Sequence, residues 1–239
     1  MIKSKEDYLF YLEADRISQR VPKKQGLPRR IKSFISPNYI WEFQKSLRKL
    51  EYSRNCKKGL IASIHRIFIK RKYRKLSMKL GFSIPTNVFG PGLSIAHYGT
   101  IVVNSGASIG ANCRLHTSVN IGTGNGHADN APTLGDNCYI APGAKLYGGI
   151  SIADNIVIGA NAVVNKSFEE NNIAIAGMPA KKIADIRTRD FIFTSSIIVE
   201  RGLNNDDDLL KLTARALAEK LNTRSTKSGT KPLEKALIS

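Results

Sequence analysis

The chain has 239 residues, of which 42% are hydrophobic, and no apolar run approaches the roughly 20 residues that cross a bilayer as a helix. Its formal net charge of +18 is concentrated in residues 1–80, where 22 Lys and Arg stand against 6 Asp and Glu. These figures argue against a membrane-spanning helix and an acidic protein, and they predict one or two folded domains. Charges interrupt the apolar part of the N-terminal segment, so we expect a cytoplasmic protein, with association at the inner face of the membrane as an option.

Residues 1–80 predict a basic helical domain. Ser4 and Asp7 have the spacing of a capping box for a first helix that ends near Ile17. A loop is predicted at 21–30. Further along, an apolar helix face is indicated by Leu60, Ile64, Ile67 and Phe68.

From residue 103 onward, apolar anchors recur every six residues. The first run ends at Ile121 and the second begins at Leu134. A small or apolar side chain follows the anchors other than Ile121 by four positions, which makes Cys113 and Cys138 packing residues, and turn formers separate the units. Such a pattern predicts a solenoid with three short strands to a coil. The anchors are Val103, Ile109, Leu115, Ile121, Leu134, Ile140, Leu146, Ile152, Ile158 and Val164.

Two features interrupt this repeat. Counting back in sixes from Val103 reaches His97, so a histidine is expected where the register calls for an apolar anchor. The step from Ile121 to Leu134 is thirteen, which predicts a loop of seven extra residues near 124–130, carrying His127 and Asp129. Residues 81–185 therefore form the predicted solenoid domain. A C-terminal extension follows at 186–239, with a helix at about 205–221 and a disordered tail.

Four segments carry a resemblance to a known family: HYGTIVVN at 97–104, SVNIGTGNG at 118–126, the repeat run 134–164 and AGMPAKKI at 176–183. They resemble the serine acetyltransferases and their relatives that O-acetylate cell-surface saccharides, over roughly residues 40–185. The resemblance implies an α+β protein in which an N-terminal α-helical domain precedes a left-handed parallel β-helix. It also implies an acetyl-CoA-dependent O-acetyltransferase that assembles as a homotrimer or a dimer of trimers.

The resemblance implies a role for each candidate site residue. His97 corresponds to the general base, a task that suits an imidazole because its pKa lies near neutrality. His116, His127 and Asp129 are candidates for substrate contact. The implied acetyl-CoA site comprises Gly122, Thr123, Ala141, Gly143, Gly159 and Ala160 along the solenoid, with Lys181 and Lys182 for the phosphates.

Departures from the family pattern concern the acceptor. Serine-specific members have Asp where this chain has Ala96 and a further His where it has Ala131, and their base-orienting Asp aligns near Ser83. We therefore expect a saccharide hydroxyl as acceptor, with L-serine as the alternative.

Three other hypotheses stay open at this point. A zinc-dependent hydration would need His97, His116 and His127 to converge, and no metal is expected because no His-x4-His pair is present. A second hypothesis is that the solenoid is a non-catalytic scaffold. The basic segment 70–75 would suit an anionic membrane surface or an acidic glycan, whereas no nucleic-acid recognition motif accompanies the charge.

Overall fold

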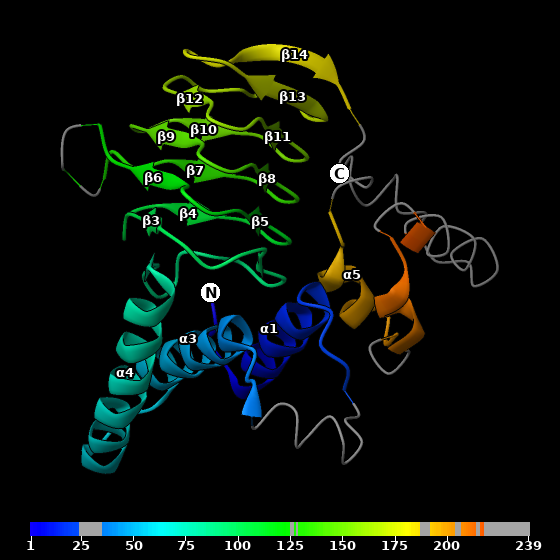
Figure 1. Ribbon diagram of the computed structural model, residues 1–239. Coiled ribbons are helices and arrows are strands. Elements are labelled where there is room, and N and C mark those ends of the chain that lie inside the picture. Colours follow the sequence, from blue (N-terminus) through cyan, green and yellow to red (C-terminus); the bar gives the residue numbers. More distant parts are fainter. Residues whose placement is uncertain are drawn as a thin grey trace.

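The computed structural model describes residues 1–23, 35–124, 127, 129–186, 192–203, 207–213 and 216–217. Three helices, α1 (Lys5–Ser18), α3 (Tyr39–Cys56) and α4 (Leu60–Leu80), pack against one another below a prism of short strands (Figure 1). The short helix α5 (Ser195–Glu200) lies beside α1 and is followed by a 3-10 helix at Asp207–Lys211. The predicted α+β arrangement of helices followed by a left-handed parallel β-helix is confirmed.

The β-helix has three faces, each of which is a ladder of strands that are parallel within the solenoid. Sheet A contains β1 (Phe82–Ser83), β3 (Ile101–Val103), β6 (Asn120–Gly122), β9 (Lys145–Tyr147) and β12 (Val163–Val164). Sheet B contains β4 (Ser108–Ile109), β7 (Thr133–Leu134) and β10 (Ser151–Ile152). Sheet C contains β2 (Ser94–Ile95), β5 (Arg114–Leu115), β8 (Tyr139–Ile140), β11 (Val157–Ile158) and β13 (Ile173–Ala176), and it ends with the antiparallel strand β14 (Lys181–Asp185).

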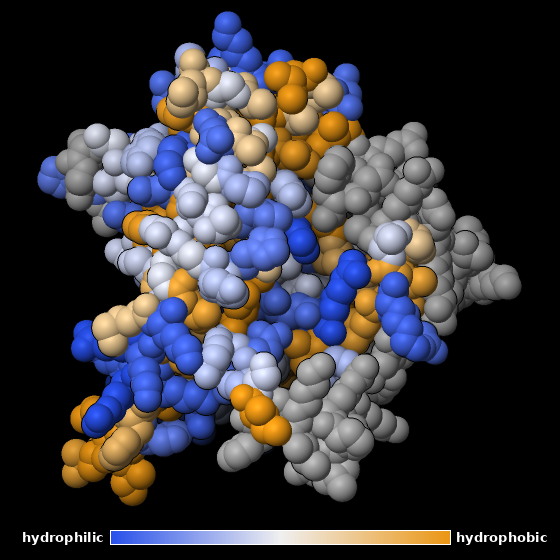
Figure 2. Space-filling view, in the orientation of Figure 1, coloured by the Kyte–Doolittle hydropathy of each residue, from blue (hydrophilic) through white to orange (hydrophobic). Residues whose placement is uncertain are grey.

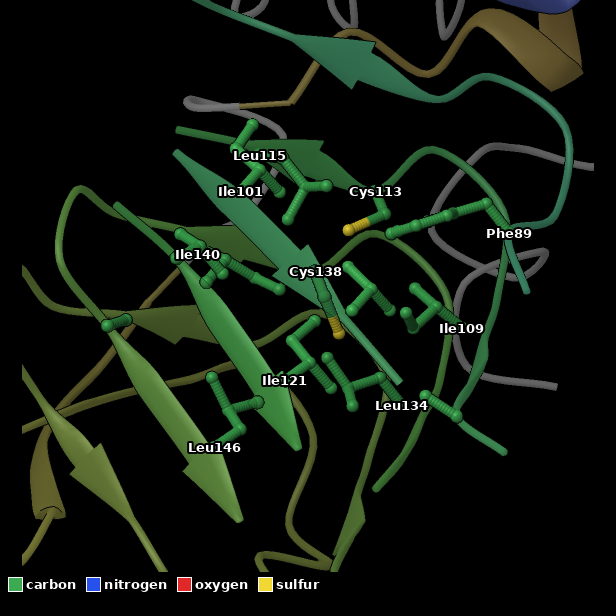
Figure 3. Packing of buried hydrophobic residues seen from close by; sticks show 14 of the residues in the cluster. Phe89, Ile101, Ile109, Cys113, Leu115, Ile121, Leu134, Cys138, Ile140 and Leu146 are labelled. Carbon is green, nitrogen blue, oxygen red and sulfur yellow. The ribbon is translucent and has the colours of Figure 1, made fainter. Parts of the chain in front are cut away.

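The predicted anchors form the core of the prism. Leu115, Ile140 and Ile158 pair in register on sheet C and are fully buried, so each anchor stacks on the anchor one coil below. Figure 3 shows Leu115 and Ile140 among the aliphatic side chains that meet in the centre, together with Cys113 and Cys138. Burial raises the pKa of the Cys138 thiol to about 12 and raises that of Cys113 well above its ordinary value, so both remain protonated packing residues.

Asparagines hold the turns between sheets B and C. Asn112, Asn137 and Asn155 have positive φ angles of 55°, 56° and 59°, a conformation that their short polar side chains tolerate. The Nδ2 of Asn112 donates to Oδ1 of Asn137 over 3.0 Å, and the Nδ2 of Asn137 donates to Oδ1 of Asn155 over 3.0 Å. A buried amide ladder thus fixes the stacking of the coils.

A buried ion cluster joins the helices to the first coil. The guanidinium of Arg48 donates to Asp15 Oδ2 over 2.7 Å and to Glu51 Oε2 over 3.0 Å, and all three side chains are almost completely buried. It also donates to the carbonyls of Phe89 and Gly90, while Asp15 accepts the N–H groups of Gly92 and Leu93. Helices α1 and α3 are therefore fastened to the start of the solenoid.

The N-terminal capping box is confirmed, because Asp7 N–H donates to Ser4 Oγ and Ser4 N–H donates to Asp7 Oδ2. Within the helix predicted at 205–221, residues 207–211 form a short 3-10 helix, and the described residues 216–217 are α-helical. Leu209 and Leu210 pack there against Ile17 and Ile198, which a five-residue turn is long enough to achieve. The predicted tail and most of the predicted loop at 21–30 lie outside the described residues.

Candidate active site

His97 lies in the turn that follows strand β2, at the corner between sheets C and A. The expectation that it occupies an anchor position is wrong: Ile95, which is buried and pairs with Leu115, is the anchor of this side. Ile95 and Val103 are eight positions apart where the repeat has six, so the turn between them holds two extra residues. This longer turn leaves His97 exposed, whereas an inward-pointing imidazole would have been buried among aliphatic side chains.

His116 is the second imidazole of this corner. It follows strand β5 and lies in register with Ala96 one coil before it and Ala141 one coil after it. Its ring centroid is 6.1 Å from that of His97 and 5.0 Å from that of Tyr139. His97 and His116 therefore lie close together within one chain.

The environment of His116 keeps its ring neutral. The side chain is buried, and within the described residues its Nε2 has no hydrogen-bond partner. Burial lowers the pKa of His116 to about 4, with further lowering by the positive charge of Arg114 and by His97. At neutral pH it is thus an uncharged group beside the exposed His97.

Two residues of this corner were missed by sequence reasoning. Arg114 and Tyr139 each directly precede an anchor, and they project from the outer face of sheet C next to His116. Arg114 Nη1 donates to Ser94 Oγ over 3.4 Å. The signal was available in the repeat: the position before each anchor points outward, and here it carries large polar side chains.

Small residues form a strip along the same corner. Ala141 and Gly159 continue the register of His116, and Gly143 and Ala160 lie beside them in the turns. Both glycines have structural reasons of their own: Gly143 has a φ of 78°, and a Cβ on Gly159 would lie 2.8 Å from the Cβ of Ala176. The backbone and packing of the coil therefore require these glycines, and the same small side chains would also let a ligand approach the backbone closely.

The remaining predicted acetyl-CoA residues lie apart from this strip. Gly122 ends strand β6 and Thr123 follows it, at the corner between sheets A and B. Lys181 and Lys182 are exposed on β14, at the far end of sheet C. Lys182 Nζ already pairs with Glu170 over 2.6 Å and with Asp185 over 2.7 Å, and these carboxylates raise its pKa. Among the described residues Lys181 has no such ion pair.

The inserted loop also leaves the solenoid at the corner between sheets A and B. Pairing across it, from Leu115 to Ile140, spans seven residues more than the pairing from Ile140 to Ile158, as predicted. His127 and Asp129 are exposed on this loop, whose base is fixed where Asn130 Oδ1 accepts the N–H of Gly149 over 2.6 Å. Within one chain the loop and His97 thus occupy different corners of the prism.

The three departures from the serine-specific pattern are visible in the structure. Ala96 is half-buried directly before His97, Ala131 is buried before Pro132, and Ser83 is exposed on β1. No cluster of three or more His, Cys, Asp or Glu side chains able to hold a metal ion occurs within the part of the chain that the structure describes.

Comparison with known proteins places this geometry in a family. Residues 131–166 match the family described as bacterial transferase hexapeptide (six repeats). The serine acetyltransferase of Helicobacter pylori (strain ATCC 700392 / 26695) is 34% identical over 123 residues, which cover 50% of this chain and 71% of that protein. The chain belongs to the serine acetyltransferase family.

Other serine acetyltransferases extend the comparison. That of Staphylococcus aureus (strain Mu50 / ATCC 700699) is 33% identical over 124 residues, or 48% of this chain, and the chain spans only 58% of its length. The crystal structure of the Brucella abortus strain S19 enzyme has a TM-score of 0.57 at 23% identity, with 76% of this chain and 70% of that chain covered. A serine acetyltransferase in complex with CoA has a TM-score of 0.56 at 19% identity, with 75% and 71% covered. These two structures share the fold.

Proposed function

We propose that this protein transfers the acetyl group of acetyl-CoA to an alcohol oxygen, with His97 as the general base. The observation that carries the proposal is the exposed imidazole of His97, which a lengthened turn presents at the solenoid corner in a chain of the serine acetyltransferase family. An alcohol is a weak nucleophile at neutral pH, and a positioned imidazole can remove its proton as the oxygen attacks.

The proposed reaction balances through one histidine. His97 accepts the hydroxyl proton while the acceptor oxygen bonds to the thioester carbonyl carbon, which gives a tetrahedral oxyanion. Collapse of this oxyanion breaks the carbon–sulfur bond, and the imidazolium returns its proton to the departing thiolate. The products are the acetyl ester and free CoA, and the imidazole is neutral again.

The outer surface of the corner fits an extended thioester substrate. The strip of small residues lies between the coil of His97 and the coil of β13, which are four strand spacings or about 19 Å apart. It leads toward Lys181, which lies on the strand after β13 and is free to meet a phosphate. The thioester can approach His97 because the neighbouring Ala96 and the neutral ring of His116 carry no charge. Arg114 adds a positive charge beside His116.

Two acceptors are supported by different observations. The similarity to named serine acetyltransferases favours L-serine over the saccharide expected from the sequence. The alanines at 96 and 131 favour a saccharide hydroxyl, because neither can bind the charged groups of an amino acid. Purified protein with acetyl-CoA and either L-serine or a panel of glycans decides the matter through release of free CoA: turnover with serine alone removes the saccharide proposal, and turnover with glycans alone removes serine.

Substitution of His97 tests the catalytic proposal itself. We expect His97→Ala to lower turnover by roughly 10²–10⁴, since loss of a general base removes an effect of that size. His97 is exposed, so the thermal midpoint should stay near that of the parent protein. Replacement of the exposed Tyr98 by Ala, one position along the same turn, is the matched control. Equal activities of the parent and His97→Ala proteins would contradict the assignment and favour a scaffold.

A homotrimer is part of the same proposal. The inserted loop with His127 and Asp129 lies at one corner of the prism and His97 at another, so only a neighbouring chain can bring the two together. Cyclic packing of three prisms would place the loop of one subunit beside His97 of the next. Sedimentation equilibrium should give three times the chain mass, and a monomer with full activity would contradict this arrangement.

A further inference from the structure

Helix α4 exposes an apolar surface at the end that is remote from the solenoid. The predicted apolar residues do lie on one face of the helix, but this face is exposed to solvent: Ile61 is 85% exposed and Phe68 is 66% exposed. The opposite face, with Ile69, Leu76 and Leu80, is the one that is buried. We call the exposed apolar side chains the α4 tip; they are Leu60, Ile61, Ile64, Ile67 and Phe68.

A basic surface adjoins the α4 tip on the same helix. Arg71, Arg74 and Lys75 are exposed in the two turns that follow the tip, and the 21 residues of α4 include no Asp or Glu. Figure 2 shows the two zones on the free end of α4 at the lower left, where apolar side chains gather at the extremity below a hydrophilic band. The exposed surface of α4 is thus apolar in its first half and basic in its second half.

Two other basic residues of α4 are engaged elsewhere. Arg66 donates to the carbonyls of Ser53 and Lys57, and Lys72 pairs with Glu42 over 2.9 Å. Arg71, Arg74 and Lys75 have no ion pair with any described residue, which leaves their charge for an external anion.

Hollows on both sides of the helix are suited to anionic head groups. One, of about 520 Å³, is lined by Ile67, Lys70, Arg71, Arg74, Lys75 and Met78. Another, of about 410 Å³, has Lys49, Lys57 and Lys58 around Tyr52, Ile61 and Ile69. Neither lining includes a carboxylate, so both combine apolar walls with positive charge only.

We propose that the α4 tip and its basic band dock the protein on an anionic lipid bilayer. Apolar side chains would enter the interface while the adjacent Arg and Lys meet phosphate groups. A second copy of the chain fits less well, because it would set one basic band against another. An acidic glycan would satisfy the charges but leave the apolar tip in water. No helix within the described ranges is long and apolar enough to span the membrane, so the proposed contact is interfacial.

Vesicle co-sedimentation with the full-length protein tests the proposal. The parent protein should bind vesicles of phosphatidylcholine with phosphatidylglycerol, and much less those of phosphatidylcholine alone. Joint substitution of Arg71→Gln, Arg74→Gln and Lys75→Gln should weaken binding roughly 100-fold, because each basic residue near an anionic surface contributes several-fold. Ile61→Ser with Phe68→Ser should weaken it at least about tenfold, through loss of buried apolar area.

A matched variant separates local from global charge. Lys3→Gln, Lys5→Gln and Lys166→Gln together remove the same net charge at exposed positions outside α4, and binding should stay within about threefold of the parent. Circular dichroism confirms folding of each variant. Absence of binding to anionic vesicles, or equal losses in the two charge variants, overturns the proposal. Sedimentation velocity in the same buffers tests the alternative that a second copy covers the α4 tip. If the parent protein forms a larger assembly that the Ile61→Ser, Phe68→Ser variant does not form, and binds no vesicles, the membrane proposal is overturned. Acetyl transfer in solution is independent of all these outcomes.

Discussion

His116 couples the stability of the fold to pH. In an unfolded chain a histidine titrates near its ordinary value of 6.5, whereas in the folded protein burial lowers the pKa of His116 to about 4. Between these values the unfolded chain binds more protons, so stability contributed by the neutral ring is complete above pH 6.5 and is lost as pH falls toward 4.

A His116→Phe substitution should flatten this acid loss. Phenylalanine keeps a ring beside Tyr139 but cannot bind a proton, so the free energy of unfolding should fall less between pH 6.5 and 4 than it does in the parent protein. Urea denaturation at a series of pH values measures both slopes. Parallel curves for the two proteins would contradict the assignment.

Single residues show where sequence reasoning succeeds and where it stops. His97 is recognisable from the segment around it. Its place outside the apolar register could not be predicted, because the turn between Ile95 and Val103 holds two extra residues that counting back in sixes does not reveal. The availability of Lys182 could not be predicted, because its partner Glu170 lies twelve positions away and meets it only after β14 folds back on β13.

At the scale of the element, the asparagine ladder keeps the coils in register. Turn formers between the repeat units predicted where the coils bend. The structure adds that the buried Asn137 is hydrogen-bonded to Asn112 one coil before it and to Asn155 one coil after it. The α4 helix illustrates the opposite case. Its periodic apolar residues predicted the helix correctly, but periodicity marks a face without specifying whether that face meets the core, and Ile69, Leu76 and Leu80 took that place.

Substitution of Asn137 separates the two contributions of the ladder. We expect Asn137→Ala to lower the free energy of unfolding by about 2–4 kcal/mol, since it loses two amide contacts and places an alanine at positive φ. Asn137→Gly lacks the same contacts but tolerates the backbone, so it should be the more stable variant by about 1 kcal/mol. Chemical denaturation measures both, and equal losses would mean that backbone strain contributes nothing here.

For the whole molecule, the buried Arg48 cluster makes helices and solenoid one folding unit. Arg48→Met should lower the free energy of unfolding by about 3–5 kcal/mol, because Asp15 and Glu51 would stay buried without their cation. Helical signal in the far ultraviolet and the fluorescence of Trp41 on α3 report the unfolding transition. Glu6→Gln, which alters an exposed carboxylate on α1, is the control for a general effect on that helix. A loss below about 1 kcal/mol would show that water or rearranged side chains replace the cation.

The two closed ends of the prism have a consequence for how the protein behaves in concentrated solution. Phe43 and Leu80 pack into the core at the first coil, and at the last coil β14 covers β13 in the antiparallel direction. A parallel coil left uncovered would offer unpaired backbone groups to another molecule, and opposite ends that join head to tail produce filaments when both are uncovered. The helices and the final hairpin therefore act as terminators, and removal of residues 1–80 should make the protein aggregate by exposing the apolar first coil.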